Sequence, residues 1–446
     1  MVTKNHSVLR ESGGFFFLTL NMKISDFIYR YFDIKEGYQL PEKLLKVLLN
    51  ESEKEKFLDG IAGLNLDYSV DIFRDFFQDE HGDRDKLKQD YTPDSVSQIV
   101  ARKIKNGDKV LDVCAGTGSL SISAISRAPD IFLRCEEFSE RAIPFLLANL
   151  SLRNVNVEVI RKDVLTNETF EVYRLRKGQK FSRLEKVKTI DNILFDVVIS
   201  NPPYSLKWNP KEDERFENYP LPPKQFADFC FVIHGIFSLN ETGKASFILP
   251  HGVLFRSNQE QKVRESLIRN NLISGLIGLP DKLFLNTAIP VAILELEKSH
   301  PRKGVFVVNA HDEFTKRPAQ NILEQVHIDK ILAVCEEEKE VKDFSRFVAY
   351  EELETNDFNL NIPRYVMKFE EEVIDFASTV KEIVKIEKEI VSTEKEFIRQ
   401  LSELTGFSLN ELEQIQEWKK LFGQTSKKLP RLKELLKAKD TQLELF

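Results

Sequence analysis

Residues 110–118 read Val-Leu-Asp-Val-Cys-Ala-Gly-Thr-Gly, and this stretch decides the fold. Its apolar first half is typical of a short buried strand, and the Gly-x-Gly at its end is typical of a tight turn. Glycine lets the backbone approach a ligand closely, and the N-terminus of a helix that begins after Gly118 would face that ligand. The third glycine of the dinucleotide-binding fingerprint is missing, because position 121 is Ser121. Taken alone, the stretch indicates either a ligand-binding loop or an ordinary tight turn.

Outward from this loop, short apolar runs alternate with segments of helical periodicity. The runs that predict strands are 131–133, 155–160, 195–200, 245–249, 276–279, 291–296 and 305–308. Alternating strands and helices are the signature of an α/β protein. The sequence therefore predicts one doubly wound sheet across the middle of the chain.

The composition divides the chain into four parts. We expect residues 1–21 to be a disordered leader, with Met22 as an alternative start. Residues 22–88 carry apolar side chains at helical spacing and predict a small, non-catalytic helical domain. Residues 89–366 hold the α/β pattern. Residues 367–446 are rich in charge and predict a helical, coiled-coil-like tail.

An apolar stripe along the tail approximates a heptad repeat. It consists of Val373, Phe376, Val380, Ile383, Ile390, Phe397 and Leu401. A one-sided stripe must be buried against something. The tail therefore either packs on its own core or docks a partner subunit.

The chain of 446 residues carries a formal net charge of −7. Any contact with nucleic acid must therefore use a local basic patch or a partner subunit, because bulk positive charge is absent. The four cysteines include no Cys-x-x-Cys pair, so the sequence indicates no metal knuckle and no disulfide framework. A reduced, cytoplasmic compartment is expected. No apolar run reaches the roughly 18 residues that a membrane span needs.

Carboxylates follow two of the predicted strands. Glu136 and Glu137 come after the run 131–133, where one of them can accept hydrogen bonds from both hydroxyls of a ribose. Asp163 follows the run 155–160, where it can accept a hydrogen bond from the amino group of an adenine. The alternatives are two solvated loop acids and an ordinary helix cap.

Residues 201–204 read Asn-Pro-Pro-Tyr and follow a buried strand. Pro202 and Pro203 stiffen the backbone and remove two N–H donors. This leaves the side-chain oxygen of Asn201 and the Pro202 carbonyl as acceptors, and Tyr204 adds a flat aromatic face. Two acceptors beside a stacking ring suit a planar group that bears an NH2.

The same region contains longer ordered motifs, at residues 89–93, 137–149, 227–231, 243–256, 279–287 and 357–365. Together with Asn201–Tyr204 they resemble the amino-group methyltransferases that use S-adenosylmethionine. More narrowly, residues 86–366 resemble the modification subunit of type I restriction–modification systems, an adenine-N6 DNA methyltransferase. The resemblance implies a Rossmann-like methyltransferase fold, S-adenosylmethionine as cofactor and double-stranded DNA as substrate.

The resemblance also implies a role for each motif residue. Those that hold the cofactor are Tyr91, Thr92 and Pro93 beside its methionine end, Asp112, Gly116 and Gly118 beneath it, Glu137 on the ribose, Phe138 against the adenine ring and Asp163 on the adenine amino group. Those that act on the target are Asn201 and Pro202, which hold the amine, Pro203, which stiffens the loop, and Tyr204, which stacks on the flipped base. The chain departs from the family pattern at two positions. Val113 stands where proline is usual, and Tyr204 where phenylalanine is usual.

Three alternatives share parts of this pattern. A cytosine-N4 DNA methyltransferase holds the same kind of exocyclic amine, a protein glutamine methyltransferase acts on an amide NH2, and a non-catalytic scaffold keeps only the fold. The glutamine enzyme does not explain Tyr91–Pro93 or Leu279–Thr287, and the intact Asn201 argues against a scaffold.

No segment of the sequence resembles a target-recognition domain. Basic residues gather at 174–188, which either grips DNA phosphates or forms a solvated hairpin. For a chain of net negative charge, a separate specificity subunit is the simpler source of sequence recognition. We expect residues 367–446 to dock it, and a restriction subunit is a further partner in such systems.

Overall fold

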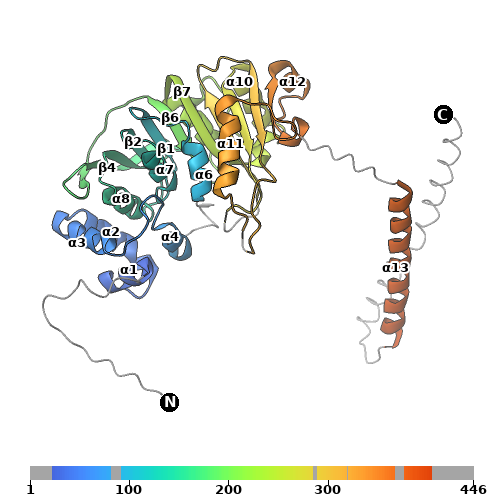
Figure 1. Cartoon of the computed structure of the whole chain (residues 1–446), viewed down its shortest axis with the longest axis horizontal. Coiled ribbons are helices and arrows are strands. Elements are labelled where there is room, and N and C mark those ends of the chain that lie inside the picture. The colour runs from blue at the N-terminus through green and yellow to red at the C-terminus, as the bar shows by residue number, and fades with distance from the viewer. Residues whose placement is uncertain (1–22, 82–91, 285–288, 319, 367–375, 404–446) are drawn as a thin grey trace. The chain divides into compact units, whose positions relative to one another are not determined.

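A computed structural model describes residues 23–81, 92–284, 289–318, 320–366 and 376–403 of the chain (Figure 1). The chain separates into two compact units, Met1–Lys368 and Phe369–Phe446. The first unit contains a group of N-terminal helices and a large sheet, and the described part of the second unit is one helix.

The N-terminal helices form a layer of their own. They are α1 (Ile24–Phe32), η1 (Gly37–Gln39), α2 (Leu40–Leu48), α3 (Glu51–Ala62) and α4 (Arg74–His81). Asn50 caps α3 by accepting a hydrogen bond from the Glu53 backbone N–H, and Pro41 lies in the first turn of α2, where its missing N–H costs nothing. The helix α2 packs against α8 (Ile143–Leu152), so this predicted helical layer shares a core with the α/β part (Figure 1).

One mixed sheet forms the centre of the first unit. Among the described residues it has the strand order β11-β10-β8-β9-β7-β6-β1-β2-β3-β4-β5. The strands are β1 (Lys109–Val113), β2 (Phe132–Glu137), β3 (Val157–Asp163), β4 (Glu168–Arg176), β5 (Arg183–Val187), β6 (Phe195–Ser200), β7 (Leu239–Pro250), β8 (Ile273–Gly278), β9 (Val291–Glu297), β10 (Gly304–Asn309) and β11 (Ser345–Ala349). The strands β3, β2, β1, β6 and β7 run parallel, and the chain order reverses between β1 and β6. Such a reversal leaves a crevice at the carboxyl ends of the strands, where ligands bind.

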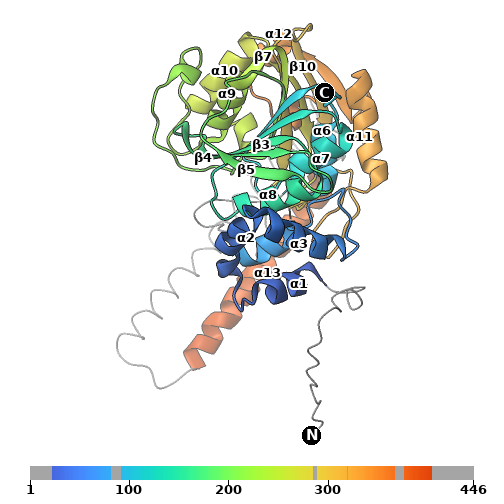
Figure 2. The ribbon, with the colours of Figure 1, turned by 90° about the vertical axis from the view of Figure 1, so that its left-hand side faces the viewer.

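Helices cover both faces of the sheet (Figure 2). The helices α6 (Asp94–Ala101), α7 (Ser119–Arg127) and α11 (Gln325–Glu337) lie on one face, and α9 (Asp228–Ser238) and α10 (Gln259–Arg269) lie on the other. Each face has its own apolar core. Shorter elements are η2 (Glu214–Phe216), η3 (His251–Leu254), α12 (Tyr350–Thr355) and η4 (Ile362–Arg364). The predicted α/β, doubly wound architecture is confirmed.

The sequence prediction missed three strands. The strands β4 and β5 form an antiparallel hairpin at one edge of the sheet, and β11 pairs antiparallel with β10 at the other edge. The sheet is also mixed, because β9 runs antiparallel between β7 and β8. The strand β4, next to the edge strand β5, is exposed along part of its length, so its sequence carries polar residues and no continuous apolar run.

The second unit contains the helix α13 (Phe376–Glu403), in agreement with the predicted helical tail. The stripe residues Ile383, Ile390 and Phe397 are each at least 40% exposed on this helix. Val373 and the predicted leader lie outside the described residues. Within the described ranges, no helix is both long enough and apolar enough to cross a membrane.

Candidate active site

A cavity of about 230 Å³ opens at the carboxyl ends of β1, β2, β3 and β6, where the strand order reverses. Three kinds of group line it. The backbone of the glycine loop follows β1, acidic side chains end β2 and β3, and the Asn-Pro-Pro segment follows β6. The cavity therefore brings together the glycine loop, the acids after the second and third predicted strands, and the Asn-Pro-Pro segment, all of which the sequence indicated.

Residues with positive φ shape the glycine loop. The φ angles of Cys114, Gly116 and Gly118 are 63°, 57° and 106°. Glycine adopts such angles at no steric cost. The Gly118 N–H donates to the Ala115 carbonyl at 2.9 Å, and α7 begins at the next residue. The first turn of α7 therefore lies beside the cavity, and the N-terminus of a helix favours negatively charged groups at that end.

Glu137, the last residue of β2, fixes this loop. Its carboxylate accepts hydrogen bonds from the backbone N–H groups of Gly116 at 2.8 Å and Ser139 at 2.6 Å. Burial raises the pKa of Glu137, and these N–H groups counteract the rise. Each carboxylate oxygen has two lone pairs, so Glu137 keeps acceptor capacity for a ligand hydroxyl in the cavity it lines.

Glu136, its neighbour, has a different set of partners. Its oxygens lie 2.8 Å from His234 Nε2 and 3.1 Å from Lys162 Nζ. These partners lower the pKa of Glu136 to about 2 despite its burial. The pairing separates the two acids, since Glu136 is held by His234 and Lys162, whereas Glu137 holds the loop. Sequence reasoning missed His234 because it lies 98 positions from Glu136 and forms no local motif with it.

Asp112 lies beneath the loop and is fully buried. Its Oδ2 accepts a hydrogen bond from the Ser121 hydroxyl at 2.6 Å, whereas its Oδ1 has no hydrogen-bond partner in the described part of the chain. Burial, together with the charge of Glu137, raises the pKa of Asp112 to about 7. A buried acceptor without a donor is costly, and a positively charged ligand above the loop would offset that cost.

Asp163 ends β3 and lines the cavity. Its Oδ1 accepts a hydrogen bond from the backbone N–H of Leu165 at 2.9 Å, so the side chain closes a turn as well as facing the cavity. The buried Arg215 donates to the carbonyls of Val164 at 2.5 Å and Leu165 at 3.2 Å. This guanidinium, which sequence reasoning also missed, fixes the apolar wall that follows Asp163.

Phe138 stands at the rim of the cavity with 47% of its surface exposed. Its ring packs edge-on against Phe170, with centroids 6.3 Å apart, and the Arg161 guanidinium lies 5.0 Å from the centroid of Phe170. The ring is therefore braced from β4 and keeps an accessible surface for a flat ligand.

Asn201 is held at both ends of its amide. Its Nδ2 donates to Thr92 Oγ1 at 2.9 Å, and the Tyr204 hydroxyl donates to its Oδ1 at 2.7 Å. The ring of Tyr204 is buried and packs edge-on against Phe284, with centroids 6.3 Å apart. Asn201, Pro202 and Pro203 themselves line the cavity.

Two further motifs meet behind this segment. The backbone N–H of Ser205, which has a φ of 52°, donates to Asp228 Oδ1 at 3.0 Å. Arg256 Nη2 donates to the Ser205 hydroxyl at 3.3 Å, and Arg256 also pairs with Glu260 at 3.1 Å. The motifs at 227–231 and 243–256 therefore fix the chain directly after Tyr204.

Most residues assigned from the sequence lie together. The cavity is lined by Thr92, Gly116, Glu137, Phe138, Asp163, Asn201, Pro202 and Pro203. Gly118 and Tyr204 donate hydrogen bonds to the lining residues Ala115 and Asn201, and Asp112 is hydrogen-bonded to Ser121 beneath the loop. Pro93 does not line the cavity, because it is the N-cap residue of α6 and its fixed φ serves the start of that helix. Tyr91 lies outside the described residues.

Comparison with known proteins gives the family. Residues 72–373, more than half of the chain, match N-6 DNA Methylase. The chain belongs to the N-6 DNA methylase family. The methylase subunit of the type I restriction enzyme MpnII from Mycoplasma pneumoniae is 28% identical to this chain over 306 residues, which cover 64% of this chain and 54% of that one. The methylase subunit of the type I restriction enzyme MjaVII from Methanocaldococcus jannaschii is 31% identical over 306 residues, which cover 63% and 50%.

The solved structures agree with this family. The type I restriction-modification system methyltransferase subunit from Streptococcus thermophilus, whose crystal structure is known, is 30% identical to this chain. The two structures align with a TM-score of 0.58, and the match covers 71% of this chain and 69% of that one. The fold is therefore the Rossmann-like methyltransferase fold, as predicted. The chain spans about half the length of the curated relatives it matches.

Proposed function

We propose that this methylase is a DNA adenine-N6 methyltransferase, the modification subunit of a type I restriction–modification system. It transfers a methyl group from S-adenosylmethionine to an adenine that has left the duplex, and a separate subunit supplies sequence recognition. One observation carries the proposal. The amide of Asn201 lies at an acid-lined cavity next to two prolines, fixed by Thr92 and Tyr204.

The residues around the cavity fit S-adenosylmethionine. Glu137 supplies acceptors for the ribose hydroxyls, Asp163 an acceptor for the adenine amino group, and Phe138 a flat apolar surface. The acidic lining and the unpaired Oδ1 of Asp112 suit a ligand that carries positive charge. When bound, this cofactor supplies a methyl group that is already activated on a positively charged sulfur.

Methylation of an aromatic amine is mainly a problem of positioning. The lone pair of adenine N6 is delocalised into the ring, which makes the nitrogen a poor nucleophile. Hydrogen bonds from N6–H to Asn201 Oδ1 and the Pro202 carbonyl shift the nitrogen toward tetrahedral geometry and free its lone pair for in-line attack. As the N6–CH3 bond would form, the S–CH3 bond would break, and the methylated N6 would carry a positive charge. Its proton would then be acidic enough to leave to water, so no basic side chain is needed at this centre. Flipping the base costs a few kcal/mol, which stacking on Tyr204 offsets in part.

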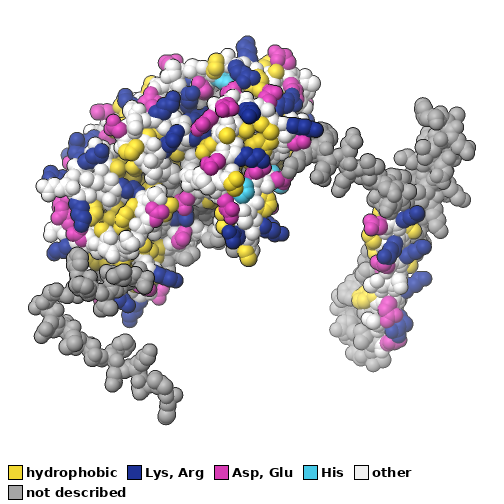
Figure 3. Space-filling model, viewed as in Figure 1, with side chains coloured by type: hydrophobic (Ala, Val, Ile, Leu, Met, Phe, Trp, Pro, Cys, Tyr) yellow, Lys and Arg dark blue, Asp and Glu magenta, His cyan; other side chains and the backbone are white. Residues whose placement is uncertain are grey.

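The charge distribution supports a separate subunit for recognition. Basic and acidic side chains are interspersed on the face drawn in Figure 3, consistent with the net charge of −7. In the basic segment 174–188, four side chains form ion pairs with carboxylates, namely Arg174, Arg176, Lys180 and Lys186. This favours a hairpin stabilised by ion pairs over a phosphate grip. We therefore assign base recognition to a specificity subunit, docked by residues 367–446, and include a restriction subunit as a further partner.

The proposal is tested by expressing the chain with its neighbouring genes and mapping methylated bases across the host genome. We expect N6-methyladenine at one recurring sequence, and none when the chain carries Asn201→Ala. N4-methylcytosine at a recurring site would show that the target base is cytosine and not adenine. Unmodified DNA together with a methylated protein glutamine would refute the assignment to DNA.

A further inference from the structure

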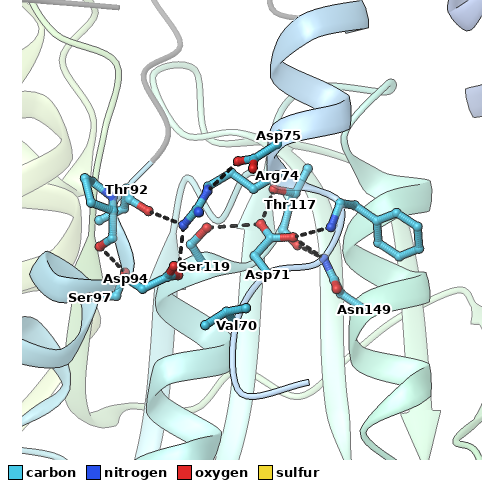
Figure 4. Close-up of polar contacts among 12 residues, drawn as sticks. Val70, Asp71, Arg74, Asp75, Thr92, Asp94, Ser97, Thr117, Ser119 and Asn149 are labelled. Atoms are coloured by element: carbon cyan, nitrogen blue, oxygen red, sulfur yellow. Dashed lines mark hydrogen bonds and ion pairs between the residues drawn. The ribbon is translucent and has the colours of Figure 1, made fainter. Parts of the chain in front are cut away.

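A buried carboxylate of the N-terminal helical layer contacts the glycine loop from outside the cavity. Asp71 lies between α3 and α4 and is 5% exposed. It accepts hydrogen bonds from the Thr117 hydroxyl at 2.5 Å, the Ser119 hydroxyl at 3.0 Å and Asn149 Nδ2 at 2.7 Å (Figure 4). The Phe73 backbone N–H adds a fourth hydrogen bond at 3.1 Å. The side chain is therefore fully engaged, although it does not line the cavity.

The two hydroxyls belong to the residues on either side of Gly118, where the loop becomes α7. Thr117 and Ser119 both contribute to the cavity lining, while their hydroxyls point to Asp71 (Figure 4). Gly118 has a φ of 106° and no side chain that restricts it. The hydrogen bonds from Thr117 and Ser119 to the Asp71 carboxylate therefore fix the backbone conformation at Gly118, which glycine by itself does not restrict.

Asn149 joins a third element to this contact. Its Nδ2 also donates to the Thr117 carbonyl at 2.8 Å. Arg153 donates to the Asn149 carbonyl at 2.6 Å and to the Val70 carbonyl at 2.5 Å. The segment around Asp71, the glycine loop and α8 are thus one hydrogen-bonded unit. Its members must keep their mutual geometry, since a buried carboxylate that loses its donors is costly.

The next turn of the same segment leads toward Asn201. Arg74 Nη1 donates to Asp94 Oδ1 at 2.8 Å and to the Thr92 carbonyl at 3.5 Å (Figure 4). Thr92 in turn accepts the hydrogen bond from Asn201. One short segment of the helical layer, which contains Asp71 and Arg74, therefore contacts both the glycine loop and Thr92, the residue that holds the Asn201 amide.

We propose that Asp71 is a positioning residue for the cofactor. Through Thr117 and Ser119 it holds the glycine loop in the conformation that receives S-adenosylmethionine. The N-terminal helical layer is in this respect a part of the cofactor site. The inference rests on the proposed function, because it takes S-adenosylmethionine as the ligand of the cavity.

The test is the dissociation constant of S-adenosylmethionine, measured by calorimetry on full-length chains at a temperature where circular dichroism shows each variant folded. Asp71→Asn keeps the shape of the side chain but removes its charge and leaves one acceptor oxygen, so it cannot accept hydrogen bonds from all four donors as the carboxylate does. We expect it to weaken binding at least tenfold. The matched control is Asp67→Asn, an exposed acid of the same segment whose carboxylate accepts hydrogen bonds from Ser69, and we expect less than a twofold change. Loss of stability alone would lower the melting temperature and leave the dissociation constant of the folded chain unchanged.

A double-variant cycle tests whether Asp71 acts through the loop. Thr117→Val removes one donor to Asp71 and should weaken binding at least threefold. In the combined variant the loss should exceed that of Asp71→Asn by no more than about twofold, because both changes break one interaction. Losses that multiply, or an unchanged dissociation constant in folded Asp71→Asn, would overturn the proposal. If Asp71→Asn does not fold, Thr117→Val decides alone, and unchanged binding by that variant overturns it.

The outcome also separates this inference from the proposed function. If the unsubstituted chain does not bind S-adenosylmethionine, both are wrong. If it binds the cofactor and the Asp71→Asn chain binds it equally well, only the positioning role is wrong. If the cofactor results are as expected but the genome shows no methylated adenine, the positioning role stands and the assignment to adenine in DNA is wrong.

Discussion

The hydroxyl of Tyr204 donates a hydrogen bond to Asn201 Oδ1 at 2.7 Å, so that one of the two lone pairs of the acceptor proposed to hold the target amine is already engaged. The ring of Tyr204 is only 6% exposed and packs on Phe284. A flipped base can stack on this ring only if the ring moves, and that movement also breaks the hydrogen bond to Asn201. Tyr204 therefore couples two events. The movement that uncovers its ring for stacking also frees the lone pair of Asn201 Oδ1 that its hydroxyl occupied.

Replacing Tyr204 separates its ring from its hydroxyl. Tyr204→Phe keeps the ring and removes a hydrogen bond that must break, so single-turnover methylation by the assembled complex should be at least as fast as with the unsubstituted chain. Tyr204→Ala removes the stacking surface, which is worth about 1–3 kcal/mol per base, and should slow methylation at least tenfold. A phenylalanine variant as slow as the alanine variant would show that the hydroxyl itself serves the reaction.

Asn201→Ala removes the acceptor without touching Glu137 or Asp163. Lost electrostatic groups of this kind cost about 100-fold or more in rate, so methyl transfer should fall below detection in routine assays. The dissociation constant of S-adenosylmethionine should change by less than about threefold. The matched control is Asn106→Ala. The Asn106 side chain only accepts a hydrogen bond from the Asp130 N–H at a turn, so this variant should keep full activity. Simultaneous loss of methylation and cofactor binding in a folded Asn201→Ala chain would contradict the assignment.

The local parts of this fold and site could be predicted from sequence because each has a local signature. The strand β6 spans Phe195–Ser200, the same residues as the predicted apolar run, since a buried parallel strand is apolar on both faces. The strand β4 was not predicted, because its buried residues Val172, Tyr173 and Leu175 alternate with charged neighbours and form no apolar run. Ion pairs at this edge of the sheet satisfy those charges, and the sequence does not show which charge meets which.

The supporting contacts of the site could not be predicted for a related reason. Asp71 and Thr117 are 46 positions apart, and no pattern within either segment indicates the other. The packing of α2 and α3 on α8 brings the helical layer to the loop, and this packing joins segments far apart in the sequence. Motifs therefore predicted residues that line the cavity, while the contacts that hold these residues in place required the tertiary structure.

Cofactor affinity should depend on two acids to different degrees. Glu137→Ala removes the proposed acceptor for the ribose hydroxyls and the acceptor that holds the Gly116 N–H. Asp163→Ala removes the proposed acceptor for the adenine amino group and the hydrogen bond from the Leu165 N–H that closes a turn. A hydrogen bond to a charged group is worth about 1.5–3 kcal/mol, so Asp163→Ala should weaken binding of S-adenosylmethionine about tenfold and Glu137→Ala more. The exposed Glu140 is the control, and its replacement by alanine should leave binding unchanged. Unchanged affinity in both Glu137→Ala and Asp163→Ala would refute the site.

Asp112 should make stability depend on pH. Burial raises its pKa to about 7 in the folded chain, above the ordinary value of 3.8. The folded state therefore holds the proton more tightly than the unfolded state, so the stabilisation is complete below about pH 4 and is lost as the pH rises through 7. Asp112→Asn carries no such proton. The melting temperature of the unsubstituted chain, relative to that of Asp112→Asn, should fall between pH 4 and pH 8. Parallel curves over this range would contradict the raised pKa.

The tail should be separable from the catalytic unit. The division between compact units falls between Lys368 and Phe369, and Val366 belongs to the first unit, because it is buried and its carbonyl accepts a hydrogen bond from Asn309 Nδ2 at 3.0 Å. A chain that ends at Lys368 should therefore keep its α/β core and its affinity for S-adenosylmethionine. Without the tail it should fail to bind the specificity subunit, and methylation at the recurring site should disappear.

The exposed apolar side chains of α13 allow a sharper version of this test within the full-length chain. They include Ile390 of the stripe and Ile386 beside it. Ile386 and Ile390 are 54% and 43% exposed, and burying such side chains against a partner gains about 25 cal/mol per Å² of apolar surface. The double replacement Ile386→Asp with Ile390→Asp should therefore abolish capture of the specificity subunit in a pull-down and leave cofactor binding unchanged. Replacing the exposed Lys381 and Lys388 of the same helix by alanine should leave capture intact. If the Asp-substituted chain and the chain ending at Lys368 both captured the specificity subunit at full strength, the tail would not be the docking element, and the contact would have to lie on the first unit.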